Sequence, residues 1–149
     1  MSIVEQVDQD LVAAMKAKEE LRLSVLRMMK SALKNKQVEL GKPVGDAEAM
    51  AVLRTLVKQR HESVEAYRKG GREDLASKEE AEIKIVEGYL PAAAPDEEID
   101  SAVAAAIAET GAAEPKDLGK VMKAAMGKLA GKNADGKRVN EKVRARLGA

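Results

Sequence analysis

The sequence predicts an all-α protein, with an N-terminal bundle of about four helices and a small C-terminal three-helix domain. The composition is dominated by Ala, Leu, Met, Glu and Lys, which are good helix formers. Val and Ile are scattered at helical rather than alternating spacing, and glycines and prolines separate the periodic segments. The length of 149 residues is enough for one domain or two small ones.

The first two helices are expected between Ser2 and Gly41. Ser2 followed by Glu5 is the signature of a capping box, in which each side chain satisfies a backbone N–H of the first turn. The apolar periodicity stops at 18–20 and resumes at Leu21, so we expect a break there, although no glycine or proline marks it. Gly41 is the expected C-terminal stop of the second helix.

The next two helices complete an N-terminal domain that is expected to cover residues 1–90. The stretch 41–45 reads GKPVG and predicts a turn, after which Asp46 is the expected N-cap of the third helix. The glycine pair at 70–71 ends that helix, and the fourth begins near 72–74. The apolar positions of the fourth helix are Leu75, Ile83, Val86 and Leu90.

Residues 91–95 read PAAAP and mark the boundary between the two domains. Two prolines four positions apart cannot continue a helix, and the alanines between them have nothing to pack, so this stretch is expected to be a linker. The C-terminal domain, residues 96–149, is short for an independent core, because domains near this size bury only about 60% of their chain surface. We therefore expect it to be the less stable and more mobile part.

Three helices are expected in the C-terminal domain. Asp96 starts the first, whose acidic first turn is favoured by the helix dipole, and Gly111 ends it. The second begins around Pro115, which is allowed in a first turn, and runs to about Leu129. After a glycine-bounded loop, Asp135 is a good N-cap for the last helix. The apolar positions of that helix are Val139, Val143 and Leu147.

The net charge of +1 hides a strong asymmetry along the chain. From Lys116 to the C-terminus there are 10 Lys or Arg and 3 Asp or Glu, whereas the remainder has 16 and 22. The charge balance is therefore +7 in the tail and −6 in the rest. A basic segment of this kind usually binds nucleic acid or another polyanion.

The helix expected around 118–129 has an apolar face and a basic face. A helical wheel puts Gly127 in the middle of the lysine row. Glycine costs a helix interior about 0.5–1 kcal/mol relative to alanine, and close approach of a phosphate backbone is one reason to accept that cost. The wheel gathers on the apolar face Leu118, Val121, Met122, Ala125 and Leu129. The candidate residues for binding the backbone of a nucleic acid are Lys116, Lys120, Lys123, Gly127, Lys132, Lys137, Arg138 and Lys142.

A plainer interpretation of the same residues stays open at this point. In this interpretation the lysines and arginines are surface charges that keep the protein soluble, and the glycines only end the helices. Under the nucleic-acid-binding interpretation, stacking on bases cannot be the main recognition mode, because Tyr67 and Tyr89 are the only aromatic residues. Binding would depend on phosphates, and six such contacts would make log affinity fall with log salt concentration at a slope of about −5.

The inventory of residues predicts a soluble cytoplasmic protein with no metal and no cofactor. There is no cysteine, and a lone His61 cannot build a zinc site. No apolar run approaches the roughly 20 residues of a membrane span, and the acidic, polar start is no secretory signal. The stretch 127–133 is one residue short of a phosphate-binding P-loop and lacks its Ser or Thr.

Several separated motifs resemble the GatB/YqeY family, and they recur in order over nearly the whole chain. In the first part they are KAK at 16–18, LRLSVLRMMKSALKN at 21–35, VKQR at 57–60, ES at 62–63, GREDL at 71–75 and EGYLP at 87–91. In the tail they are DLGKVMK at 117–123, ADGK at 134–137 and VN at 139–140.

The resemblance implies a function connected with tRNA. The family's domain also forms the C-terminal part of the B subunit of glutamine-dependent tRNA amidotransferases. It is similar to an appended domain of some glutaminyl-tRNA synthetases, and in those settings the small helical tail is associated with tRNA binding. Carbon–nitrogen ligase activity with glutamine as amido-N-donor is associated with the family name. The resemblance therefore implies tRNA as a partner, and an aminoacyl-tRNA synthetase or amidotransferase subunit as a candidate protein partner.

The residues themselves argue against catalysis by the isolated chain. Releasing ammonia from glutamine needs an activated nucleophile with an oriented base, and the chain has no cysteine, while its serines fall at caps or within helical stretches. We therefore expect no catalytic residue and prefer a tRNA-binding module that is accessory to tRNA amidation. Two alternatives are a protein–protein adaptor that docks a partner through its acidic N-terminal body, and a glutamine-dependent ligase subunit with its own activity.

Overall fold

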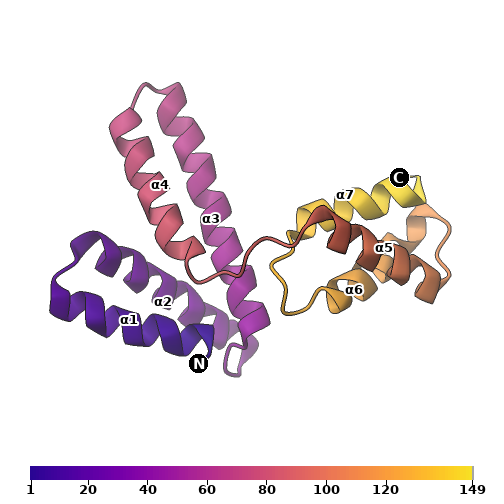
Figure 1. The fold of residues 1–149 in the computed structure, drawn as a ribbon, viewed down its shortest axis with the longest axis horizontal. Helices are drawn as coiled ribbons and strands as arrows, with labels where there is room; N and C mark the ends of the chain where they lie inside the picture. The colour runs from indigo at the N-terminus through magenta and orange to yellow at the C-terminus, as the bar shows by residue number, and fades with distance from the viewer. Residues whose placement is uncertain (149) are drawn as a thin grey trace. The chain divides into compact units, whose positions relative to one another are not determined.

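The computed structural model describes residues 1–148 and divides into two compact units (Figure 1). Met1–Leu90 is the N-terminal unit and Pro91–Ala149 is the C-terminal unit, of which Ala149 lies outside the described residues. The predicted all-α fold class is confirmed, because the described residues form seven α-helices, one short 3₁₀ helix and no strand.

The N-terminal unit consists of two helical hairpins, as Figure 1 shows. Its helices are α1 (Ile3–Ala17), α2 (Glu20–Leu40), α3 (Asp46–Lys69) and α4 (Glu73–Glu87). All four contribute to the main core, whose buried members include Val7, Leu26, Met29, Leu53 and Val86. A smaller cluster holds α3 and α4 together and consists of Val64, Ala76 and Ile83.

Both ends of α1 agree with the sequence analysis. Ser2 Oγ accepts a hydrogen bond from the Glu5 N–H at 3.1 Å, and the Glu5 carboxylate accepts one from the Ser2 N–H at 3.3 Å, so the capping box is confirmed. The expected break lies at Lys18, whose φ of 57° is in the left-handed region that glycine normally occupies. The chain therefore turns between α1 and α2 without a glycine or a proline.

The prediction that Asp46 caps α3 is wrong. The N-cap is Gly45, and Asp46 is the first residue of the helix. The Asp46 carboxylate instead accepts a hydrogen bond from the backbone N–H of Ile3, at 2.9 Å. It satisfies one of the amides that the first turn of α1 leaves unpaired, so a residue typical of caps serves a helix distant in sequence.

The C-terminal unit consists of α5 (Asp96–Thr110), η1 (Pro115–Asp117), α6 (Leu118–Lys128) and α7 (Gly136–Leu147). Small and β-branched side chains from all three α-helices form its core, which includes Ile99, Val103, Val121, Ala125, Val139 and Val143. Asp135 caps α7 as expected, because its carboxylate accepts a hydrogen bond from the Lys137 N–H at 3.0 Å.

Residues 91–95 are fixed to the rest of the C-terminal unit. The side-chain amide of Asn133 donates to the Pro91 carbonyl at 2.9 Å, and the Ala94 N–H donates to the Asn133 carbonyl at 2.8 Å. Ala94 also packs against the core. The expectation that this stretch has nothing to pack is therefore wrong. Its partners are the side-chain amide and the backbone carbonyl of Asn133 in the α6–α7 loop, which the side chains of PAAAP do not reveal.

Candidate nucleic-acid interface

The helix α6 has the two faces that the helical wheel predicted. On the apolar face Val121, Ala125 and Leu129 are buried, and Leu118 and Met122 are half-buried. On the opposite face Lys120 and Lys123 are exposed, and Lys116 in η1 is exposed just before the helix. The basic row is therefore accessible to a ligand.

Two glycines lie bare on the exposed side of α6. A Cβ atom added to Gly127 or to Gly119 would have no heavy atom within 4 Å, and neither glycine has a positive φ. No contact with the rest of the described chain therefore explains them. Gly119 is the second residue of α6 and Gly127 the last but one, so the cost of about 0.5–1 kcal/mol for glycine in a helix interior applies to neither in full. Gly127 was singled out from the sequence. Gly119 was not, although the same wheel places it beside Lys123.

The lysines around these glycines are available to bind anions. Among residues 1–148, no acidic group lies within 4 Å of the Lys123 or Lys137 ammonium. Lys120 lies 4.0 Å from the Asp117 carboxylate, and Lys116 lies 3.0 Å from that of Glu114. Both pairs are local and their lysines are exposed, and pairs of this kind contribute about 0–1 kcal/mol. A phosphate can therefore replace either acid.

The other three predicted basic contacts are each paired with the acidic first turn of α5 or the residue after it. The Arg138 guanidinium donates two hydrogen bonds to the Asp96 carboxylate. The Lys142 Nζ lies 2.7 Å from Asp100 Oδ1, and the Lys132 Nζ lies 3.1 Å from a carboxylate oxygen of Glu98. The hydrogen bonds from Arg138 lower the pKa of Asp96 below its usual value, so this carboxyl is ionised at neutral pH. The structure thus separates the predicted site into open and paired residues.

The charge asymmetry changes when the two units are counted separately. The C-terminal unit has 10 Lys or Arg and 9 Asp or Glu, a balance of +1, and the N-terminal unit has 16 of each. Residues 91–115 contain six acidic residues and no basic one. The acidic excess outside the tail therefore belongs to the same unit as the basic tail, and the expectation of an acidic N-terminal body is wrong.

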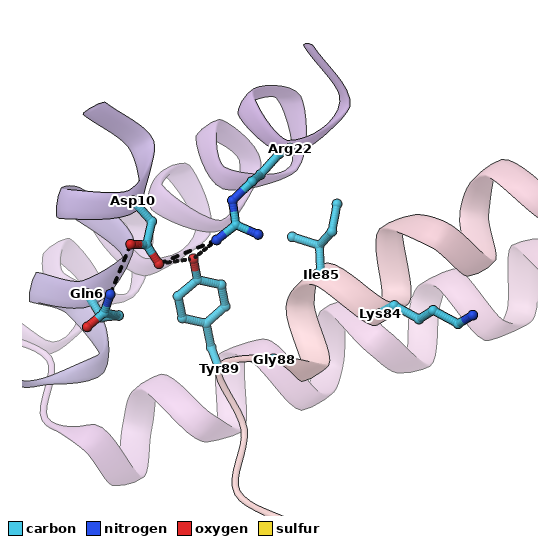
Figure 2. A pocket seen from close by; sticks show the side chains of 7 residues that line it. All are labelled: Gln6, Asp10, Arg22, Lys84, Ile85, Gly88 and Tyr89. Atoms are coloured by element: carbon cyan, nitrogen blue, oxygen red, sulfur yellow. Dashed lines mark hydrogen bonds and ion pairs between the residues drawn. The ribbon is translucent and has the colours of Figure 1, made fainter. Parts of the chain in front are cut away.

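A polar cleft in the N-terminal unit is the other feature that resembles a site (Figure 2). Asp10 accepts a hydrogen bond from the Gln6 amide at 2.9 Å and another from the Tyr89 hydroxyl. An Arg22 Nη lies 3.2 Å from the Tyr89 hydroxyl and 3.6 Å from Asp10 Oδ2. In Figure 2 the Lys84 ammonium points away from this cluster. The three central groups satisfy one another, so we interpret the cluster as a structural link between α1, α2 and the end of α4.

Tyr89→Phe is expected to lower the free energy of unfolding by about 0.5–1.5 kcal/mol, because it removes hydrogen bonds between these elements. Burial, together with Asp10, raises the pKa of Tyr89. The stabilisation that follows from a raised pKa is present below the unfolded value of about 10 and is lost as the pH rises above it. Urea unfolding should therefore show a larger loss of stability between about pH 9 and 11 in the wild type than in the variant. Equal losses would contradict this interpretation.

No group of three His, Asp or Glu side chains in the described part of the chain could hold a metal ion, and His61 is exposed on α3. None of the helices that the structure describes is long and apolar enough to cross a membrane.

Comparison with known proteins relates nearly the whole chain to one family. The family model described as Yqey-like protein matches residues 4–147. Three relatives carry the name "Altered inheritance of mitochondria protein 41, mitochondrial". The protein of Vanderwaltozyma polyspora is 39% identical over 99 residues, which cover 64% of this chain and 53% of that protein. The protein of Lachancea thermotolerans is 34% identical over 116 residues, which cover 75% of this chain and 62% of that protein. The protein of Kluyveromyces lactis is 38% identical over 111 residues, which cover 72% of this chain and 60% of that protein. The matches cover just over half to about three-fifths of these relatives' length.

Proposed function

This chain belongs to the YqeY-like protein family, and from that premise we propose that it is a tRNA-binding helical module. It would be accessory to glutamine-dependent tRNA amidation and non-catalytic on its own. The observation that supports the proposal most directly is an exposed surface that we name the α6 strip, made of Lys116, Gly119, Lys120, Lys123 and Gly127. Its bare glycines have no structural partner among the described residues, whereas a ligand would give them one.

The chemistry of the α6 strip suits a sugar–phosphate backbone. Where the Cβ atom is missing, a nucleic-acid strand can approach the helix backbone closely, and the flanking ammonium groups can bind its phosphates. Both tyrosines lie in the N-terminal unit, so the C-terminal unit has no aromatic ring on which a base could stack. Recognition would therefore depend on phosphates and on the shape of a folded RNA, as for double-stranded regions.

The choice of tRNA among polyanions follows from the resemblance of the motifs to tRNA amidotransferase subunits. The names of the relatives place those proteins in mitochondria and state no activity for them. A cytoplasmic location, which the sequence led us to expect, has no support from these names. Mitochondria and cytoplasm each hold a pool of tRNA, so the proposed function is compatible with either compartment.

Titration of the purified chain with labelled tRNA at several salt concentrations tests the proposal. Among the predicted contacts, Lys116, Lys120, Lys123 and Lys137 are the open or locally paired cations, so about four phosphate contacts are expected. The slope of log affinity against log salt should then be about −3 to −4, shallower than the slope of about −5 for six contacts. A single-stranded oligonucleotide of similar length is the control and should bind more weakly. Absence of tRNA binding at low salt would refute the proposal.

A protein–protein adaptor is the second candidate, and a different surface supports it. Val12 and Met15 on α1 and Leu21 at the start of α2 are large apolar side chains with exposed fractions of 47%, 49% and 38%. Val12 and Met15 are three residues apart on α1 and so share a face of that helix, and exposed apolar side chains on one face are typical of a protein contact. Recovery of a specific protein after nuclease treatment, with no tRNA binding by the purified chain, would favour the adaptor. A glutaminase assay addresses the ligase alternative, and we expect no activity from the isolated chain.

A further inference from the structure

The acidic beginning of α5 faces the basic face of α7 within the C-terminal unit. Asp96 and Asp100 are one helical turn apart on α5, and their partners Arg138 and Lys142 are one turn apart on α7. The two ion pairs therefore connect the helices at successive turns. Glu98 binds Lys132 of the α6–α7 loop in addition.

These carboxylates oppose the binding of a polyanion to their partners. A cation that already neutralises a carboxylate contributes little to counterion release when a phosphate arrives. The carboxylate also repels the phosphate at short range. The Asp96 and Arg138 side chains are about half exposed, at 51% and 50%. The pair is nevertheless bidentate, with two guanidinium hydrogen bonds to one carboxylate, which holds Arg138 more firmly than a single contact at an exposed lysine would.

We propose that the acidic residues Asp96, Glu98 and Asp100 are internal competitors that withhold Arg138, Lys132 and Lys142 from a bound polyanion. They confine the ligand to the α6 strip and Lys137 and limit its affinity. The proposal rests on the proposed function only for the identity of the ligand, because any polyanion meets the same competition.

Asp96→Asn tests the competition, and Glu97→Gln is the matched control. Both substitutions remove one negative charge from the first turn of α5 and leave an amide of similar size. Glu97 is exposed and forms no ion pair with any residue of the described chain, so its loss frees no cation. Relative to wild type, Asp96→Asn should strengthen tRNA binding roughly 3- to 10-fold and steepen the salt slope by about 1. Adding Asp100→Asn should steepen it by about 1 more, whereas Glu97→Gln should change affinity less than about twofold.

Arg138→Gln provides a second test in two backgrounds. In the wild type it should change tRNA affinity less than about twofold, because Arg138 is withheld, and in Asp96→Asn it should abolish the gain. Circular dichroism of each variant confirms that the helices are retained. A loss of affinity in the wild-type background as large as that caused by Lys123→Ala would overturn the proposal.

Retention on immobilised heparin separates this proposal from the tRNA proposal. If Asp96→Asn elutes at higher salt than wild type and Glu97→Gln but neither wild type nor variant binds tRNA, the competition stands and the tRNA proposal falls. If wild type binds tRNA and Asp96→Asn is no tighter than Glu97→Gln on either ligand, the competition is refuted and the tRNA proposal stands. If nothing binds and Asp96→Asn gains no retention, both are refuted.

Discussion

Leu26→Ala is expected to lower the free energy of unfolding of the N-terminal unit by about 2–5 kcal/mol. Leu26 is completely buried on α2, in a core that also contains Val7, Met29 and Leu53. Truncation removes the burial of three carbon atoms and leaves a cavity among side chains from several helices, which cannot all move inward together. A loss of this size is a large part of the 5–15 kcal/mol that stabilises an ordinary domain.

Urea unfolding followed by tyrosine fluorescence measures this loss in the correct unit, because both tyrosines belong to the N-terminal unit. Leu21→Ala is the control, since it makes the same chemical change on the same helix at a side chain that is 38% exposed. It should lower stability by less than about 1 kcal/mol. Similar losses in the two variants would show that Leu26 does not lie in a tightly packed core.

The double variant Lys120→Ala/Lys123→Ala is expected to weaken tRNA binding by a factor on the order of 10–100 near 0.1 M salt. It should also make the salt slope shallower by about 2, because two phosphate contacts are lost. These lysines lie between the bare glycines of the α6 strip, and their side chains are exposed. The fold should be unaffected, since both side chains are outside the core and alanine is a good helix former.

Lys128→Ala is the matched control for a single lysine, because it removes the same charge from the same helix. Its ammonium is 2.7 Å from the Glu109 carboxylate, and its position on the wheel is away from the strip. It should weaken tRNA binding less than about threefold. If Lys128→Ala weakens binding as much as Lys123→Ala does, total charge rather than the strip attracts the RNA. An unchanged affinity in the double variant would exclude the α6 strip as the interface.

Helix ends could be predicted from the sequence wherever a local interaction defines them. The Ser2–Glu5 capping box and the Asp135 cap join residues two or three positions apart. Gly41 and Gly111 end α2 and α5 in the left-handed conformation, with φ of 68° and 67°, as their position after an apolar stripe predicts. The basic face of α6 was predictable for the same reason, because it depends on the geometry of a single helix.

Contacts between distant parts of the chain could not be predicted in this way. Asp46 binds the Ile3 N–H, Asn133 binds the Pro91 carbonyl and Arg138 binds Asp96, at separations of 43, 42 and 42 residues. Each of these polar residues also has an acceptable local role as a cap, a turn residue or a surface charge. Helical periodicity specifies the face of a residue and not the helix opposite it, so the division of the basic residues into open and paired groups required the structure.

The bare glycines of α6 also affect the exchange of backbone hydrogens with solvent. With no side chain above them, water reaches these peptide groups, and local opening of the helix is easier there than on its buried apolar face. A nucleic-acid strand lying on the α6 strip would exclude that water and oppose the opening. The backbone amides around Gly119 and Gly127 would then exchange more slowly in the complex than in the free protein. Hydrogen exchange of the wild-type chain would therefore locate the ligand without any substitution.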